Sequence, residues 1–219
     1  EKVRKICDEF GTVLIFDEVV SGFRVALGGT SEFCGVLPDL ACFGKAMANG
    51  FPISAVVGCR EIMQKMEDIF FSVTFGGETI SLAAAAATID KLERENVPIR
   101  LAKRGRFLTQ RANTVLAQHG LQEIMKFSGN AWLPRLNFYN SPIDIDVLKT
   151  LVRQELVAKG LLLGATFGLC LAHDDDATTD ETISSIDQAA ATIREALNSR
   201  DPATALIGEK IQSVFEVRP

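Results

Sequence analysis

VLIFDE, at residues 13–18, is a run of four apolar residues followed by two acidic ones. An unbroken, partly β-branched apolar run of this length is typical of a strand that is buried on both faces of a parallel sheet. Asp17 and Glu18 then stand at the carboxyl end of that strand, where open α/β sheets bind their ligands. The stretch therefore predicts an α/β fold with a candidate site beside Asp17.

The residues on either side of this strand extend the pattern. Residues 1–10 predict an amphipathic helix that ends at Gly11. Residues 40–43 (LACF) predict a second short buried strand, and Gly44 and Lys45 stand at its end. Two polar side chains, Asp17 and Lys45, are therefore expected at neighbouring strand ends.

Two more strands and a helix are predicted before residue 97. The strands cover residues 54–58 and 70–73, and the second is followed by a glycine-containing turn at 74–77. Residues 79–94 predict a helix with five consecutive alanines at 83–87. Because alanine lets another element approach closely, we expect this helix in a domain or subunit contact.

The chain changes character at Pro98, which begins a helix expected to end near Gly120. Beyond it, strands are predicted at 133–139, 161–163 and 167–172, and a helix at 145–160. Thr178 and Glu181 have the spacing of a capping box at the start of a last helix. We therefore expect two domains, residues 1–97 with an α/β fold and residues 98–219 with an α+β fold.

The composition excludes several classes of protein. With 219 residues, 47% hydrophobic and 23% charged, the chain can bury a real core, unlike a disordered tail, a collagen-like fibre or a disulfide mini-protein. Its net charge of −5 and lack of a basic cluster argue against a nucleic-acid partner. The apolar stretch at 69–89 carries Glu78 and adjacent glycines, so a membrane span is not expected.

The cysteines and acidic residues suggest neither disulfides nor a metal site. Five cysteines, an odd number without a Cys-x-x-Cys pair, indicate free thiols in a reducing cytoplasm. Three adjacent aspartates at 174–176 are interpreted as a solvated loop, because they cannot all face one metal ion, and His173 before them as a surface residue. The chain begins at Glu1 without methionine or an apolar signal segment, which suggests a fragment.

Asp17 and Lys45 are the residues most able to carry chemistry. A carboxylate at a buried strand end needs a cationic or donor partner, although a helix cap or loop hydrogen bond would also satisfy it. A lysine flanked by small residues can lose its proton and act as a nucleophile, although such a lysine can also extend into solvent. Together the two suit a cofactor held between them, with the amine forming an imine and the acid meeting a ring nitrogen.

A P-loop ATPase is the main alternative from another class. Four apolar residues before Asp17 and Glu18 also match the strand that holds magnesium in such enzymes. The phosphate-loop motif is missing, because Gly44-Lys45 is followed by Ala46 and the residue five before Gly44 is Asp39. A phosphate loop upstream of residue 1 would keep this alternative open.

Three blocks in order resemble the class III pyridoxal-phosphate aminotransferases: residues 13–24 (VLIFDEVVSGFR), residues 38–52 with Gly44-Lys45, and residues 74–77 (TFGG). The resemblance extends to about Leu197. Residues 22–24 (GFR) and the glycine pair at 28–29 are most similar to the branch that contains glutamate-1-semialdehyde aminomutase. The resemblance implies fold type I, with residues 1–97 as part of the large cofactor-binding domain and 98–219 as the small domain.

The resemblance also implies the roles of four residues. Lys45 would form a Schiff base with pyridoxal 5'-phosphate and shuttle the substrate proton, and Asp17 would pair with the pyridine nitrogen. Val19 would pack against the ring, and Thr74 would reach the cofactor phosphate of the neighbouring subunit. The expected protein is therefore a cytoplasmic homodimeric enzyme with a shared active site, which moves an amino group between an amine donor and a carbonyl acceptor.

Two departures from the family pattern bear on the substrate. Val20 stands where many members have glutamine, and residues 167–173 (FGLCLAH) lack the arginine that binds a substrate carboxylate in many members. This favours an aminomutase that shifts the amino group within one substrate as an alternative to transamination. A chain that lacks the upstream half of the family would bind cofactor weakly and show little turnover, and a non-catalytic fragment is a further alternative.

Overall fold

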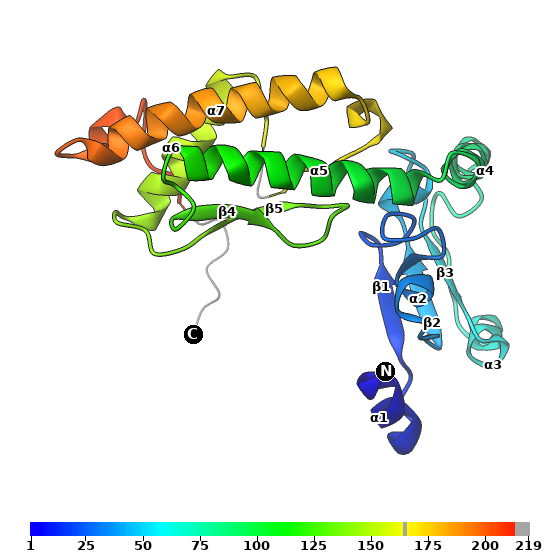
Figure 1. Cartoon of the computed structure of the whole chain (residues 1–219). Helices are drawn as coiled ribbons and strands as arrows, with labels where there is room; N and C mark the ends of the chain where they lie inside the picture. The colour runs from blue at the N-terminus through cyan, green and yellow to red at the C-terminus, as the bar shows by residue number, and fades with distance from the viewer. Residues whose placement is uncertain (164–165, 213–219) are drawn as a thin grey trace. The chain divides into compact units, whose positions relative to one another are not determined.

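The computed structural model describes residues 1–163 and 166–212, and the chain divides into two compact units (Figure 1). The first unit is Glu1–Arg100 and the second is Leu101–Pro219. The predicted boundary between residues 97 and 98 lies just inside the first unit. Each unit is described by itself.

The first unit is built on a three-stranded sheet of β1 (Ile15–Glu18), β2 (Leu40–Phe43) and β3 (Ala55–Gly58), in that order. β1 and β2 are parallel, with Asp17 opposite Cys42 and Glu18 opposite Phe43, whereas β2 and β3 are antiparallel. The strands predicted at residues 40–43 and 54–58 are therefore confirmed, and the strand predicted at 13–16 is present but lies two residues later, so that Asp17 and Glu18 belong to it. The parallel pair brings the carboxyl ends of β1 and β2 to one edge of the sheet.

Four α-helices and two 3₁₀ turns accompany this sheet. They are α1 (Lys2–Phe10), α2 (Gly29–Cys34), α3 (Arg60–Met63) and α4 (Thr79–Arg94), with turns at Lys45–Met47 and Gln64–Glu67. The predicted helices 1–10 and 79–94 are confirmed. α1 ends as expected, because Gly11 adopts a left-handed φ of 61° that glycine reaches without a side-chain clash.

Burial in the first unit differs from the prediction. β1 was expected to be buried on both faces, yet Ile15 is 53% exposed, because β2 is its sole neighbour in the described sheet. Residues 70–73 form no strand, since no neighbouring strand pairs with them in the described residues, and Phe70 is 96% exposed. The buried cluster is small and consists of Met47, Ala48 and Ala85, with Phe23 and Phe43 packed against it.

The alanines of α4 are only partly covered. Ala85 is buried, whereas Ala83, Ala86 and Ala87 are exposed within the described chain. The helix begins at a cap that the sequence pattern did not reveal: the Glu78 carboxylate accepts hydrogen bonds from the Ile80 and Ser81 amides. The close contact expected at the alanines stays a prediction.

The second unit packs helices against a two-stranded hairpin. α5 (Val97–Gln118) begins in the first unit and continues through the second, followed by β4 (Met125–Ser128), β5 (Arg135–Phe138), α6 (Ile145–Ala158) and α7 (Asp176–Asn198). Short 3₁₀ turns lie at Leu171–His173 and Pro202–Ala205. The core holds large, fully buried side chains, among them Leu121, Met125, Leu148, Leu151 and Ile193. No helix in the described part of the chain is long and apolar enough to cross a membrane.

Several details of the second unit correct the sequence-based picture. The strand at 133–139 and the helix from 145 are confirmed, but residues 161–163 and 167–172 form no strands. β5 pairs with β4, and Thr166 forms an isolated bridge to Arg135. β4 was missed because its four residues alternate apolar and polar side chains too briefly to stand out. The capping box at Thr178 is also wrong, since α7 starts earlier and Asp175 caps it through the Thr178 amide.

Candidate functional site

The parallel pairing of β1 and β2 brings two of the predicted site residues to the same edge of the sheet. Asp17 lies in β1 opposite Cys42, and Lys45 follows directly after the end of β2 and Gly44. Both side chains are exposed. The burial expected for them is not observed, and this edge of the sheet is open to a ligand in the described chain.

Lys45 has an unusual backbone conformation. Its φ is +41°, in the left-handed region that a residue with a side chain adopts at a cost of about 1–3 kcal/mol. The preceding Gly44 is extended, and the following Met47 and Ala48 are buried in the core of the first unit. The Lys45 ammonium group has no hydrogen-bond or ion-pair partner among residues 1–163 and 166–212. The fold therefore holds the backbone and leaves the amine available.

Val19 contacts Asp17 and packs beside Gly44, the residue before Lys45. Its amide donates to Asp17 Oδ1 at 3.1 Å, which orients the carboxylate. On its other side, Val19 Cγ1 is 3.7 Å from the position that a Cβ on Gly44 would occupy, so the valine packs beside the backbone that leads to Lys45. An acid, an apolar side chain and an amine are thus gathered at one sheet edge.

Glu18 belongs to this region, although sequence reasoning gave it no role in a cofactor site. It is only 1% exposed and is held by Ser21 and Thr30. Strand alternation could have indicated this, because neighbours in a strand point to opposite faces and Asp17 faces outward. The hydroxyl residues that follow at positions 21 and 30 were the remaining signal in the sequence.

Thr74 is not brought to the other three residues by any described contact. It is exposed in the turn at residues 74–77, and its neighbours in the preceding loop expose large apolar side chains. Within one chain, the geometry therefore joins Asp17, Val19 and Lys45 and leaves Thr74 apart.

Asp39 fixes the opposite end of the same pair of strands. Its Oδ2 accepts from the Leu14 amide at 2.7 Å and from Arg4 Nη1 at 2.9 Å, which ties the entry of β1 and helix α1 to the entry of β2. The Leu14 amide first, and the Arg4 guanidinium second, hold the pKa of Asp39 below its usual value of 3.8. The register that places Asp17 opposite Cys42 is supported from this end.

The lowered pKa of Asp39 gives a pH-dependent prediction. A carboxyl with a depressed folded pKa contributes stability above its unfolded pKa of about 3.8 and loses it as the pH falls through the folded pKa. We expect Asp39→Asn to lower the urea midpoint of unfolding at pH 7, with the difference from wild type shrinking below about pH 4. Asp68→Asn, which removes an exposed carboxylate that pairs with Lys65, is the matched control. A difference that stayed constant down to pH 3 would contradict this assignment.

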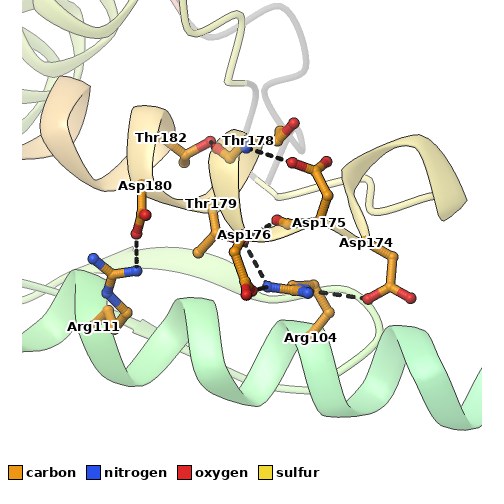
Figure 2. A network of polar contacts seen from close by, with 9 residues as sticks. All are labelled: Arg104, Arg111, Asp174, Asp175, Asp176, Thr178, Thr179, Asp180 and Thr182. Atoms are coloured by element: carbon orange, nitrogen blue, oxygen red, sulfur yellow. Dashed lines mark hydrogen bonds and ion pairs between the residues drawn. The ribbon is translucent and has the colours of Figure 1, made fainter.

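The acidic run of the second unit is part of its fold. Arg104 on α5 binds Asp174 at 3.1 Å, Asp176 at 2.8 Å and Thr179 Oγ1 at 3.0 Å (Figure 2). The hydrogen bond that Arg104 donates to Asp176 is the largest cause that raises the pKa of Arg104. The expected exposure is seen at Asp175 and Asp176, but the run has more structure than a solvated loop: Asp174 and Asp176 bind Arg104, and Asp175 caps the start of α7.

The remaining polar features of the second unit are also structural. In Figure 2, Arg111 reaches Asp180 on α7 one turn further along, at 2.5 Å. His173 is exposed as expected, and its Nδ1 accepts from the Cys170 amide at 3.1 Å. No group of three or more histidine, cysteine or acidic side chains in the described ranges could hold a metal ion.

A cavity of about 420 Å³ lies in the second unit, between α5, the start of α7 and residues 159–163 and 166–169. It contains none of the four predicted site residues. The hydroxyls of Thr179, Thr182 and Ser185 in its wall already donate to backbone carbonyls. The open sheet edge of the first unit is the better candidate site.

Comparison with known proteins matches both the sequence blocks and the fold. A family model described as Aminotransferase class-III matches residues 1–141. The chain is 33% identical over 201 residues to 3-aminobutyryl-CoA aminotransferase of Cloacimonas acidaminovorans, covering 90% of this chain and 48% of that protein. It is 37% identical over 153 residues to glutamate-1-semialdehyde 2,1-aminomutase of Methanococcoides burtonii, covering 68% of this chain and 36% of that protein.

The fold of the chain is also similar to that of a solved structure. The FumI protein of Sphingopyxis sp. MTA144, in its PLP internal aldimine form, superposes with a TM-score of 0.82 at 29% identity, covering 93% of this chain and 49% of that chain. The chain thus spans about half the length of this protein and at most about half that of the two curated relatives.

Proposed function

The chain belongs to the class-III aminotransferase family, and we propose from this that it forms part of a pyridoxal-phosphate enzyme that moves an amino group between an amine donor and a carbonyl acceptor. Its fold is that of part of a fold-type I pyridoxal-phosphate transferase. The observation that carries the proposal is the meeting of Asp17, Val19 and Lys45 at the carboxyl edge of β1 and β2.

The residues at this edge fit pyridoxal phosphate. The cofactor needs an amine for covalent attachment, an anion beside its pyridine nitrogen and an apolar surface for its ring. Lys45 supplies an amine without a partner in the described chain, Asp17 an exposed carboxylate, and Val19 an apolar side chain that packs beside Gly44. Together these three residues meet each of the requirements.

Each residue performs a distinct task. When bound, the cofactor would draw off the electron pair released as the Cα–H bond of the amine substrate breaks. The Lys45 amine would bind the cofactor covalently and then, once freed by the substrate, accept the Cα proton and deliver it to the cofactor carbon C4′. The Asp17 carboxylate would hold a proton on the pyridine nitrogen, because a nearby negative charge favours the protonated form. Val19 would limit water on the ring face that it covers.

A second copy of the chain is the partner that we propose for the loop around Thr74. The loop exposes a contiguous group of large apolar side chains, which marks an interaction surface: Ile69, Phe70, Phe71, Val73 and Phe75. Burying this loop against the other subunit would bring Thr74 near the cofactor phosphate there, where its hydroxyl could donate a hydrogen bond.

This proposal predicts a homodimer that depends on the loop. We expect the active enzyme to sediment as a dimer, and Phe70→Asp to raise its dissociation constant about tenfold or more, because it places a charge in an apolar contact. Phe33→Asp, an exposed phenylalanine on α2, is the control and should leave the dissociation constant unchanged. A monomeric active enzyme, or equal effects of both variants, would contradict the proposed interface.

An aminomutase that shifts the amino group within one substrate is the second candidate. The similarity to glutamate-1-semialdehyde 2,1-aminomutase of Methanococcoides burtonii and the absence of arginine in residues 167–173 favour it. The glycines at positions 22 and 29, which resemble this branch, are weaker support for an aminomutase. A Cβ on Gly22 would lie 2.6 Å from Phe43 Cδ1, and one on Gly29 2.7 Å from Glu18 Oε1, so packing alone requires both glycines.

The P-loop ATPase alternative receives no support. Family membership points to a different chemistry, and Glu18 is buried against Ser21 and Thr30 rather than open to a nucleotide-bound metal ion.

Reduction with borohydride separates the remaining alternatives. The protein is loaded with pyridoxal phosphate, its visible absorption is recorded, and the reduced peptide is mapped; label on Lys45 supports the proposal. ATP binding without a visible band would overturn it, and binding of neither ligand would favour a non-catalytic fragment.

A further inference from the structure

Glu18 is the buried acid of the site region that the proposed chemistry does not use. Its carboxylate accepts from Ser21 Oγ at 2.5 Å, the Thr30 amide at 2.6 Å and Thr30 Oγ1 at 2.9 Å. With 1% exposure, it depends on these three donors in place of water. A buried, fully hydrogen-bonded acid next to a proposed cofactor residue calls for a structural explanation.

We infer that Glu18 is a positioning residue, which holds the Val19–Gly28 loop against the ends of β1 and β2 and thereby fixes Asp17 and Val19 for the cofactor. This inference rests on the proposed function. The three donors come from both ends of the loop, since Ser21 lies near its start and Thr30 just after its end. A single carboxylate therefore clamps the two ends of the loop to β1.

The backbone of the loop packs too closely for another arrangement of Glu18. A Cβ on Gly29, whose φ is +70°, would lie 2.7 Å from Glu18 Oε1, so the carboxylate rests directly against the chain there. The Gly22 amide donates to the Glu18 carbonyl at 2.8 Å, and Gly22 itself lies against Phe43 at the end of β2. The loop is thus held to both strands that carry the site.

Two contacts connect the loop to the proposed cofactor residues. The first is the bond from the Val19 amide to Asp17 Oδ1, which exists only while the chain turns directly after Glu18. The second is the contact of Phe23 with Phe43, whose ring centroids are 5.4 Å apart, because Phe43 directly precedes Gly44 and Lys45. Opening the loop would therefore loosen the orientation of Asp17 and remove cover from the end of β2.

Three substitutions separate positioning from simple stability. In Glu18→Gln the side-chain oxygen still accepts from the Thr30 amide, and its amide donates to the Ser21 and Thr30 hydroxyls, which can turn and accept. Glu18→Met keeps the length but leaves a buried amide and two hydroxyls unpaired, which is the costly case. Ser21→Ala is a milder variant that removes one donor and keeps the carboxylate, in case Glu18→Met does not fold.

A matched control exists in the same part of the chain. Glu32 is exposed on α2 and accepts from the Gly28 amide at 2.6 Å, so Glu32→Gln changes a carboxylate at the end of the same loop without touching the buried cluster. We expect this variant to behave as wild type in both measurements below.

The first measurement is hydrogen exchange of the full chain, which needs no cofactor. We expect Glu18→Met to speed exchange of the Val19, Gly22 and Thr30 amides about tenfold or more, and Ser21→Ala to do so less. Glu18→Gln should restore slow exchange, and the β2–β3 amides should stay unchanged. Unchanged exchange in Glu18→Met, or equal acceleration by Glu18→Gln, would overturn the inference.

The second measurement is the pH titration of the visible band of bound pyridoxal phosphate. We expect Glu18→Met, or Ser21→Ala if Glu18→Met does not fold, to shift the apparent pKa of the band in the same direction as Asp17→Asn does. The Glu18→Gln protein should have the wild-type apparent pKa. A band that does not move while loop exchange rises would show a purely structural role and overturn the inference. Failure of the proposed function is seen separately, because wild type itself would then show no band and no label on Lys45, while hydrogen exchange still reports on the clamp.

Discussion

Lys45→Ala is expected to abolish transamination by the active enzyme, with kcat lowered about 10⁴-fold, the upper range for loss of a positioned proton-transfer group. The same change removes the covalent attachment point of the cofactor, so borohydride reduction should no longer label the peptide that contains residue 45. Since the Lys45 amine has no partner in the described chain, its removal should leave the free energy of unfolding nearly unchanged. The expected result is therefore a folded and inactive protein.

Lys65→Ala is the matched control for this prediction. Lys65 is an exposed lysine of the same unit whose ion pair with Asp68, at 3.5 Å, lies at the surface. This variant should keep both labelling and activity. Label on a lysine other than Lys45 in the wild-type protein, or substantial activity of Lys45→Ala, would contradict the assignment of the nucleophile.

Asp17→Asn is expected to lower kcat by about 10²–10³, the range seen when one preorganised electrostatic group is removed. Asparagine keeps an oxygen that can accept from the Val19 amide, so the loop geometry is retained and only the negative charge is lost. Without that charge the pyridine nitrogen loses its proton at a lower pH. Because the visible band reports the imine conjugated with this ring, the apparent pKa of the band should shift.

Titration of the visible band against pH, together with steady-state kinetics, tests this second prediction. Asp68→Asn removes an exposed carboxylate from the same unit and should change neither measurement. An Asp17→Asn enzyme with normal kcat, or one with low kcat and an unshifted band, would show that Asp17 does not act through the ring nitrogen.

The parts of this fold that follow from local signals could be predicted from the sequence. α1 and its glycine end, the cores of β1 and β2, and α4 all depend on residues close together in the chain. Strands need a partner, and no local pattern shows whether one is present. Residues 70–73 and 167–172 therefore have strand-like composition without forming strands in the described structure.

The same distinction applies to the candidate site, where some residues could be predicted from the sequence and others could not. Asp17 and Lys45 could be found because parallel strands bring their carboxyl ends together. The role of Glu18 could not be predicted, because the sequence does not distinguish two adjacent acidic residues. The fold shows that Asp17 faces outward, whereas Glu18 is buried and hydrogen-bonded to Ser21 and Thr30. Thr74 needs a second subunit in our proposal, so neither the sequence nor one chain can place it.

The left-handed backbone at Lys45 has a cost in stability that its amine does not explain. Among the described residues, five that are not glycine have a positive φ. Three of them are asparagines, which tolerate this conformation, and the other two are Phe23 and Lys45. Glycine would relieve the strain at residue 45, so selection for stability alone would favour glycine there. The chain therefore carries backbone strain at the residue whose amine the proposed function uses.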